Sequence, residues 1–167
     1  ISESVSSFEK ATTFHPKDTN LLFDLASLYE SNGLQDNAIL TYKKLLSIDP
    51  AHKEAKNSLA MLYNSIGVSH AWQGKSDDAI AAYKDALENK EDFKEAYNNL
   101  GAAYVDKEMI DDAIAAYKKA LEISPNFGEV YNNLGVAYTK KKAYDEAGSV
   151  FQKNQSINTN HAGPHFN

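Results

Sequence analysis

Hydrophobic residues recur along the chain at helical spacing, in blocks that polar residues, glycine and proline separate. In the segment Lys53–Gly74, Leu59, Leu62, Ile66 and His70 follow one another at intervals of three and four residues. Apolar positions at these intervals lie on one face of an α-helix. The pattern predicts nine helices and no strand, with the helices near residues 3–15, 19–32, 35–48, 53–73, 76–89, 94–107, 110–123, 128–141 and 144–157.

The hydrophobic blocks themselves repeat along the chain. The segment Tyr97–Tyr104 (YNNLGAAY) returns 34 residues later as Tyr131–Tyr138 (YNNLGVAY). The same offset of 34 relates the acidic openings of later segments and the aromatic residues that follow them: Asp77, Asp111 and Asp145; Tyr83, Tyr117 and Phe151. A fixed period of this length indicates a protein built from stacked structural repeats.

These residues resemble the tetratricopeptide repeat (TPR) family, in particular the TPR region of O-linked N-acetylglucosamine transferase. The first helix of each unit carries an aromatic residue, Leu-Gly and Tyr, the second carries Ala, an aromatic residue and Ala-Leu, and proline precedes the next unit. The resemblance implies an all-α TPR solenoid of antiparallel helix pairs that form a superhelix. We expect one array over residues 1–167, with complete units at 19–52, 53–93, 94–127 and 128–161, the second helix of a truncated unit at 1–18 and the start of another at 162–167.

Each signature residue has a mechanical reason. Glycine at 67, 101 and 135, and alanine in the second helices, leave room where the two helices of a unit approach closely. Tyr104 and Tyr138 fill the space between units. Aspartate opens the second helices, where a carboxylate can accept hydrogen bonds from free backbone N–H groups and favours the positive end of the helix dipole. We therefore expect Asp36, Asp77, Asp111 and Asp145 to cap these helices.

The second unit is longer than its neighbours. Pro50 and Pro125 are 75 residues apart, seven more than two periods of 34, and the extra residues fall before Asp77. Seven residues are nearly two helical turns, so an insertion of this size almost preserves the buried face. We expect one first helix of about 22 residues, and a kink near Gly67 is the main alternative.

Composition narrows the classes of function. The chain has no cysteine, so it has no disulfide, thiolate nucleophile or cysteine metal site. Its 17 basic residues are all lysine, and 23 acidic residues bring the net charge to −6. Nucleic-acid binding usually needs a basic face, so this chain is a poor candidate for it. No segment approaches the roughly 20 apolar residues that membrane insertion needs. The compartment stays open.

The histidines and paired aspartates that could bind a metal or act in catalysis are better explained by structural roles. His161 and His165 have a spacing that can hold zinc, but Gly163-Pro164 lies between them and no third ligand is evident. His70 takes the place of the tyrosine of other units, which favours a buried packing role. Paired aspartates such as Asp77-Asp78 recur at helix starts, which favours capping over acid–base catalysis. We expect no catalytic residues, no metal and no cofactor.

The resemblance implies a concave groove lined by one face of each first helix. Asn99 and Asn133 resemble an asparagine ladder that holds a peptide backbone, since an amide side chain can donate and accept at once. The alternative is that this asparagine only orders the helix surface. Trp72 is a further contact candidate, unless it packs against the turn at Gly74. The expected groove residues are Asn64, Val68, Trp72, Asn98, Asn99, Ala102, Val105, Asn132, Asn133, Val136 and Lys140.

These observations predict a protein–protein interaction scaffold whose groove binds an extended segment of a partner. Because Lys140 is the only basic residue of the expected groove, a neutral or basic partner is favoured over an acidic tail. The alternative is a structural or oligomerisation module that stacks through its open ends or positions an unseen catalytic domain.

Overall fold

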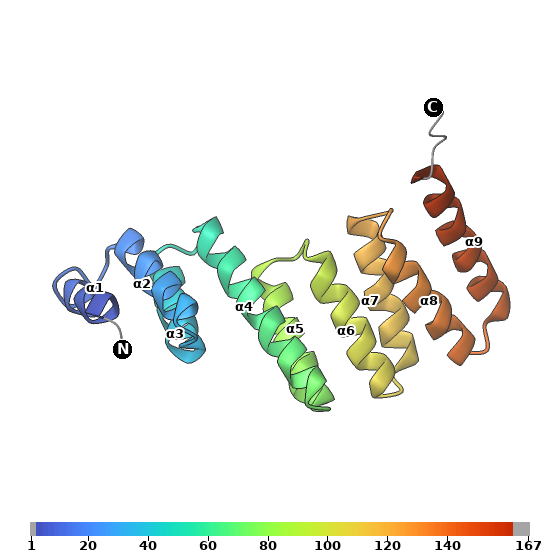
Figure 1. Ribbon diagram of the computed structural model, residues 1–167, viewed down its shortest axis with the longest axis horizontal. Coiled ribbons are helices and arrows are strands. Elements are labelled where there is room, and N and C mark those ends of the chain that lie inside the picture. The colour runs from blue at the N-terminus through green and yellow to red at the C-terminus, as the bar shows by residue number, and fades with distance from the viewer. Residues whose placement is uncertain (1–2, 162–167) are drawn as a thin grey trace. The chain divides into compact units, whose positions relative to one another are not determined.

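The computed structural model describes the backbone of residues 3–161 and the side chains of residues 3–157. This range forms nine α-helices and no strand (Figure 1). The helices are α1 (Glu3–Phe14), α2 (Thr19–Ser31), α3 (Gln35–Ile48), α4 (Lys53–Trp72), α5 (Ser76–Asn89), α6 (Lys94–Asp106), α7 (Ile110–Ile123), α8 (Gly128–Lys140) and α9 (Tyr144–His161). The predicted helices are confirmed to within one residue at each end, except that α9 continues past residue 157 to His161.

The long first helix of the second unit is also confirmed. Helix α4 has 20 residues and continues through Gly67 as one α-helix. By packing, the chain divides into an N-terminal unit, Ile1–Leu62, and a C-terminal unit, Tyr63–Asn167, so the division falls inside α4. Each unit is described by itself below.

Each unit has its own apolar core. In the N-terminal unit, α2 packs on α1 and α3, and the largest fully buried side chains are those of Val5, Leu22, Tyr42, Leu45 and Leu59. In the C-terminal unit, helices from α5 to α9 each pack on the next, and α6 also contacts α8. Its core holds Tyr83, Leu100, Tyr104, Tyr117 and Leu134 together with small alanines. A first helix is therefore sandwiched between two second helices, as stacking of repeats requires.

The signature glycines contact an aromatic ring of the second helix. A Cβ added at Gly101 would lie 2.6 Å from Cε1 of Tyr117, and one added at Gly67 would lie 2.5 Å from Cε1 of Tyr83. The expectation of a close approach at these glycines is confirmed, and the second-helix alanines Ala79, Ala113 and Ala147 are buried as expected. Each ring takes the space that a side chain on the first helix would fill.

The turn inside each helix pair has one geometry. Glu108 and Lys142 have positive φ angles of 60° and 63°, and Gly33 and Gly74 have the same left-handed conformation at the equivalent turns. At the turn after α6, the N–H of Met109 donates to the carbonyl of Tyr104 at 2.9 Å. This is the six-residue bond of a Schellman motif, which satisfies a carbonyl at the helix end.

The expectation that Asp36, Asp77 and Asp111 cap the second helices is wrong. The N-cap residues of α3, α5 and α7 are Leu34, Lys75 and Met109, and none makes a side-chain cap hydrogen bond. The aspartates lie two residues further along, in the first turn, where the dipole still favours their charge. Two of them pair instead with lysines of the following unit, Lys107 with Asp77 at 2.8 Å and Lys141 with Asp111 at 2.7 Å.

Helix α9 differs from α5 and α7. Where α7 has Ile114, Ala120 and Leu121, α9 has Gly148, Asn154 and Gln155. The ring of Phe151 is 41% exposed, whereas Tyr117 at the equivalent position is 2% exposed. The outer face of α9 thus offers less apolar surface for a further helix than α5 and α7 do.

Candidate functional site

The C-terminal unit presents equivalent side chains from α4, α6 and α8 in columns. On each helix, three positions four residues apart lie on one side: Asn64, Val68 and Trp72; Asn98, Ala102 and Asp106; Asn132, Val136 and Lys140. A second asparagine directly follows Asn98 on α6 and Asn132 on α8, and these residues, Asn99 and Asn133, form a further column. We call these positions, with Val105, the first-helix face.

Amide side chains link the helices of this face. Asn99 Nδ2 donates to Asn64 Oδ1 at 3.0 Å, and Asn133 Nδ2 donates to Asn98 Oδ1 at 2.9 Å. Both bonds join residues 35 apart, one position more than the repeat period. The repetition makes the hydrogen bonds regular: each first helix donates to the first helix of the unit before it.

The amide network extends beyond these two bonds. Asn98 Nδ2 donates to Glu129 Oε1 at 3.0 Å, so Asn98 is both donor and acceptor to α8. On the other side of α8, Asn154 Nδ2 donates to Asn132 Oδ1 at 2.7 Å. Sequence reasoning missed the partners Glu129 and Asn154. The replacement of a small alanine by Asn154 in α9 was the only available signal.

Exposure separates the predicted site residues into three groups: buried, half-buried and exposed. Asn98 is only 6% exposed and its amide is used within the unit. Asn64, Val68, Asn99, Val105 and Asn133 are half-buried. The remaining predicted residues are exposed, with Val136 at 49% and Trp72 at 87%: Trp72, Ala102, Asn132, Val136 and Lys140. One of the two sequence interpretations was that the Trp72 ring packs against the turn at Gly74. In the structure the ring is exposed instead.

The tyrosine behind this face has an unusual electrostatic setting. The ring of Tyr117 lies against Gly101 and is buried. Burial raises the pKa of Tyr117 to about 12, and the negative charges of Asp106 and Glu129 add to the rise. Two carboxylates, one from α6 and one from α8, therefore lie near this tyrosine.

The corresponding positions of the N-terminal unit are occupied by their own contacts. The hydroxyl of Tyr42 lies 3.1 Å from Ser27 Oγ and donates to Glu30 Oε2 at 3.2 Å. The ring of Phe23 stacks on His52, with centroids 5.4 Å apart. The amide columns belong to the C-terminal unit, where α4, α6 and α8 bring asparagines together.

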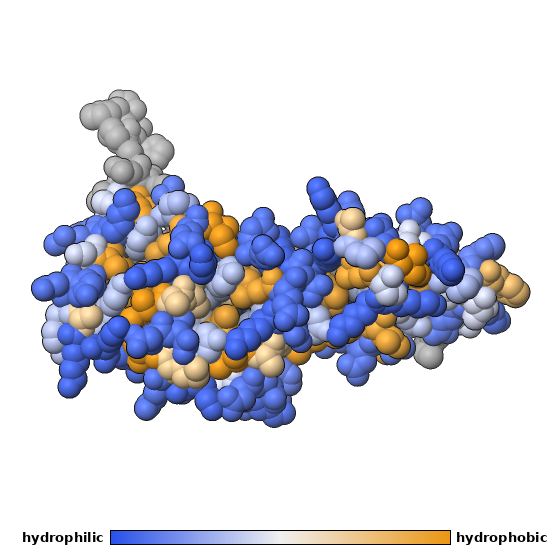
Figure 2. Space-filling model, turned by 180° about the vertical axis from the view of Figure 1, so that it is seen from behind, coloured by the Kyte–Doolittle hydropathy of each residue, from blue (hydrophilic) through white to orange (hydrophobic). Residues whose placement is uncertain are grey.

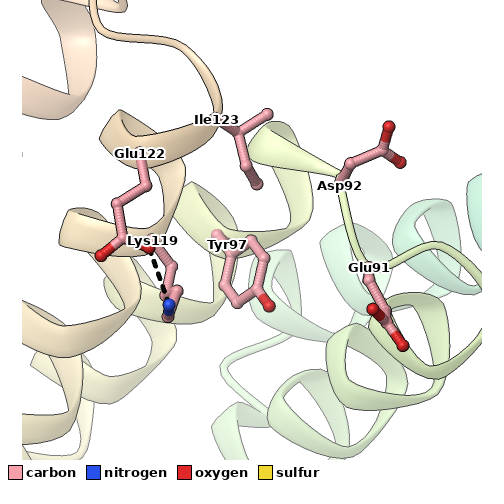
Figure 3. Close-up of a pocket in the computed structure, with 6 residues that line it drawn as sticks. All are labelled: Glu91, Asp92, Tyr97, Lys119, Glu122 and Ile123. Atoms are coloured by element: carbon pink, nitrogen blue, oxygen red, sulfur yellow. Dashed lines mark hydrogen bonds and ion pairs between the residues drawn. The ribbon is translucent and has the colours of Figure 1, made fainter.

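A separate depression of about 360 Å³ lies on the side of α6 that carries Tyr97 (Figure 3). Lys119 donates to Glu122 at 2.7 Å, and this hydrogen bond raises the pKa of the lysine, with the negative charge of Glu122 as a further cause. The lining residues come from the loop before α6, from α6 and from α7: Glu91, Asp92, Tyr97, Lys119, Glu122 and Ile123. Because its lysine is already paired, the depression offers mainly carboxylates to a ligand.

Other candidate residues give no chemical centre. His70 is half-buried, and its Nδ1 has no hydrogen-bond partner among the residues described. His165 lies outside the described residues, as does the side chain of His161. Within the described part of the chain, no group of three or more histidine or acidic residues is placed to hold a metal ion. None of the described helices is long and apolar enough to cross a membrane.

Repeated helix pairs, sandwiched first helices and ring-on-glycine contacts at a period of 34 define an α-solenoid of helix–turn–helix repeats. Family models agree with this class: a tetratricopeptide repeat model matches residues 19–52 and 128–161, and a TPR repeat model matches residues 69–108 and 103–142. The matches cover more than half of the chain. The chain belongs to the tetratricopeptide repeat family, and its fold is that of a protein–protein interaction module.

Two curated relatives match part of the chain. The probable UDP-N-acetylglucosamine--peptide N-acetylglucosaminyltransferase SPINDLY of Hordeum vulgare is 30% identical over 86 residues, which are 52% of this chain and 9% of that protein. Photosystem I assembly protein Ycf3 of Rippkaea orientalis is 29% identical over 74 residues, 44% of this chain and 43% of that protein. The chain spans less than half the length of either relative.

Solved structures share the fold over most of the chain. A crystal structure of MamA is 28% identical, with a TM-score of 0.62 over 96% of this chain and 90% of MamA. The second TPR of Spaghetti (RPAP3), bound to the HSP90 peptide SRMEEVD, is 18% identical, with a TM-score of 0.60 over 63% of this chain and 96% of that one. The second likeness concerns the fold alone.

Proposed function

We propose that the first-helix face of the C-terminal unit binds an extended segment of a partner protein. The observation that carries the proposal is the state of Asn99 and Asn133. Both are half-buried, and each uses one N–H to bond the preceding first helix. The second N–H and the Oδ1 atom of each amide have no partner among the described residues, so each amide can both donate to and accept from a peptide backbone.

The spacing of the helices supports an extended ligand. Packed helices lie about 8–10 Å apart, and an extended chain advances roughly 3.3 Å per residue. Asn99 and Asn133 would therefore contact about every third residue of the ligand. Exposed Ala102 and Val136 beside them would contact its apolar side chains.

The charge of the face supports a neutral or basic ligand. Asp106 on α6 and Glu129 on α8 are negatively charged, and Lys140 is the basic residue on the first-helix face. Complementary potentials favour the encounter of partners and disfavour like charges. An acidic tail would meet these carboxylates.

The test uses peptides selected from a random 12-residue library displayed on phage, with the full chain as bait. Replacing both Asn99 and Asn133 by Ala should weaken binding of a selected peptide about five- to 150-fold, since each hydrogen bond contributes about 0.5–1.5 kcal/mol. Isothermal titration calorimetry measures the affinity. The same change removes two bonds between helices, so the free energy of unfolding should also fall by about 1–3 kcal/mol.

A second variant separates binding from stability. Ala102 is exposed on α6, so Ala102→Glu should cost little stability but place a bulky charge on the face. Lys153→Ala, on the exposed surface of α9, is the control. If Ala102→Glu binds the selected peptides as well as Lys153→Ala does, the proposed site is wrong.

Stacking through open ends is the alternative function. The exposed ring of Phe151 is available for it, but Gly148 and Asn154 reduce the apolar surface of α9. Measurement of mass over a concentration series separates the two functions, because stacking predicts growth of mass with concentration and binding by the first-helix face does not.

A further inference from the structure

We propose that the last residues of α4, α6 and α8, namely Trp72, Asp106 and Lys140, select a partner segment with an apolar or aromatic, a basic and an acidic side chain in that order. The three partner residues would be about three apart, read in either chain direction. This inference rests on the proposed function and deepens it by naming the chemistry of the partner.

The three residues occupy one position of the repeat. They are 34 residues apart, and each ends its helix. The hydrogen bonds from Asn99 to Asn64 and from Asn133 to Asn98 join these helices in order on the same face. Because the backbone positions are equivalent, the three side chains form a row in which only the chemistry changes: an indole, a carboxylate and an ammonium group.

The neighbouring charges make the row informative. Lys107 and Lys141, each one residue beyond the row, are paired with Asp77 and Asp111 of the preceding unit. By contrast, the side chains of Trp72, Asp106 and Lys140 are exposed and make no ion pair or hydrogen bond with any residue that the structure describes. The pairs Lys107–Asp77 and Lys141–Asp111 link neighbouring repeats at their surface, and the row remains available to a partner.

The indole is the least protected apolar group of the set. Trp72 is 87% exposed, and tryptophan contributes strongly to binding where a partner covers it. An apolar or aromatic side chain of the partner would bury this ring. The carboxylate of Asp106 then favours a basic side chain beside it, with Glu129 as a second negative charge near the same tyrosine. Lys140 favours an acidic side chain at the far end.

The distances between partner residues follow from helix packing. A helix spacing of about 8–10 Å corresponds to roughly three residues of an extended chain. Residues that contact successive members of the row are therefore about three apart. The order of the three classes distinguishes this pattern from general attraction between a negative face and a basic peptide.

The test compares selection by the full chain and by its Asp106→Lys variant, with the same random 12-residue phage library. Wild type should enrich peptides in which a basic residue lies about three residues from an apolar one. The Asp106→Lys variant should enrich an acidic residue there instead. Its affinity for the wild-type peptide should fall about three- to 30-fold, and replacing the basic residue of that peptide by Glu should restore it.

Glu88→Lys is the matched control, because it makes the same change of charge on exposed surface of α5. If Glu88→Lys and Asp106→Lys change affinity and selection equally, only long-range attraction acts and the row has no role. Suppose that the selected peptides bind the wild type and that Ala102→Glu abolishes this binding, but that Asp106→Lys changes neither affinity nor the selected residues. This result would contradict the further inference and leave the proposed function intact. Failure to select any peptide, or selection only of peptides that resemble segments of this chain, would contradict the proposed function as well.

Discussion

At the scale of single residues, hydrogen bonds between asparagines of successive first helices order the first-helix face. Asn99 and Asn133 stand out because they recur with the repeat period. Their bonds to Asn64 and Asn98 could not be predicted from that period, because they join residues one position out of step on different helices. The prediction of aspartate caps was wrong because the helices begin two residues earlier than an N-cap role for Asp77 and Asp111 requires.

The turn residue Glu108 gives a first prediction. Its φ of 60° lies in the left-handed region of backbone conformation. This conformation costs a residue with a Cβ atom roughly 1–2 kcal/mol, whereas glycine adopts it without that cost. Glycine also increases the entropy of the unfolded chain by about 0.5–1 kcal/mol. Glu108→Gly should raise the free energy of unfolding in urea by up to about 1 kcal/mol. Glu108→Ala keeps the Cβ and should give no such gain; equal effects of the two changes would exclude strain at this turn.

Tyr117 predicts how stability depends on alkaline pH. Its pKa is about 12 in the folded protein against 10 for an ordinary tyrosine, so the unfolded chain loses this proton first as pH rises. The contribution of protonated Tyr117 to the free energy of unfolding is present in full below pH 10 and is lost between about pH 10 and 12. Tyr117→Phe, the residue that α9 has at this position, should lose less unfolding free energy over that interval. Parallel curves for the two proteins would contradict this prediction.

At the scale of elements, one glycine in α6 and one in α9 test whether contact with an aromatic ring explains the recurring glycine. Gly101 lies under the Tyr117 ring, with 2.6 Å between an added Cβ and Cε1, so Gly101→Ala should destabilise the protein by about 1–3 kcal/mol. Gly148, inside α9, has nothing within 4 Å of an added Cβ. Gly148→Ala should therefore stabilise by about 0.5–1 kcal/mol through helix propensity alone. Urea unfolding measures both, and effects of the same sign would mean that ring contact does not explain the signature.

Most elements followed directly from the sequence. Seven inserted residues keep the buried face of a helix nearly in phase, so α4 forms as one helix. The length of α9 did not follow, because Ser156 to His161 carry no strong apolar pattern. The division between the two units inside α4 was likewise not predicted, because the helical pattern of the sequence continues across Leu62 and Tyr63.

At the scale of the whole molecule, the family and the repeated helix pairs fix the class of function, and the specific site remains a proposal. A TPR fold presents equivalent positions at regular intervals, so small changes at one position can encode a preference for a partner. In the N-terminal unit, Ser27 and Glu30 of α2 are in hydrogen-bond contact with the hydroxyl of Tyr42, which lies on the second helix α3. The C-terminal unit keeps amides, an indole and two opposite charges at its surface, which is why the proposed site lies there.

The most direct test of binding at the first-helix face is a heteronuclear NMR titration of the full chain with one library-selected 12-residue peptide. Binding at the first-helix face should make the side-chain amide signals of Asn99 and Asn133 and the indole signal of Trp72 shift together and saturate at one peptide per chain. Signals of exposed residues on the second helices, such as Glu88 and Lys153, should stay in place. Saturable shifts confined to α5, α7 or α9, with the three first-helix signals unchanged, would contradict the claim that the first-helix face is the binding site.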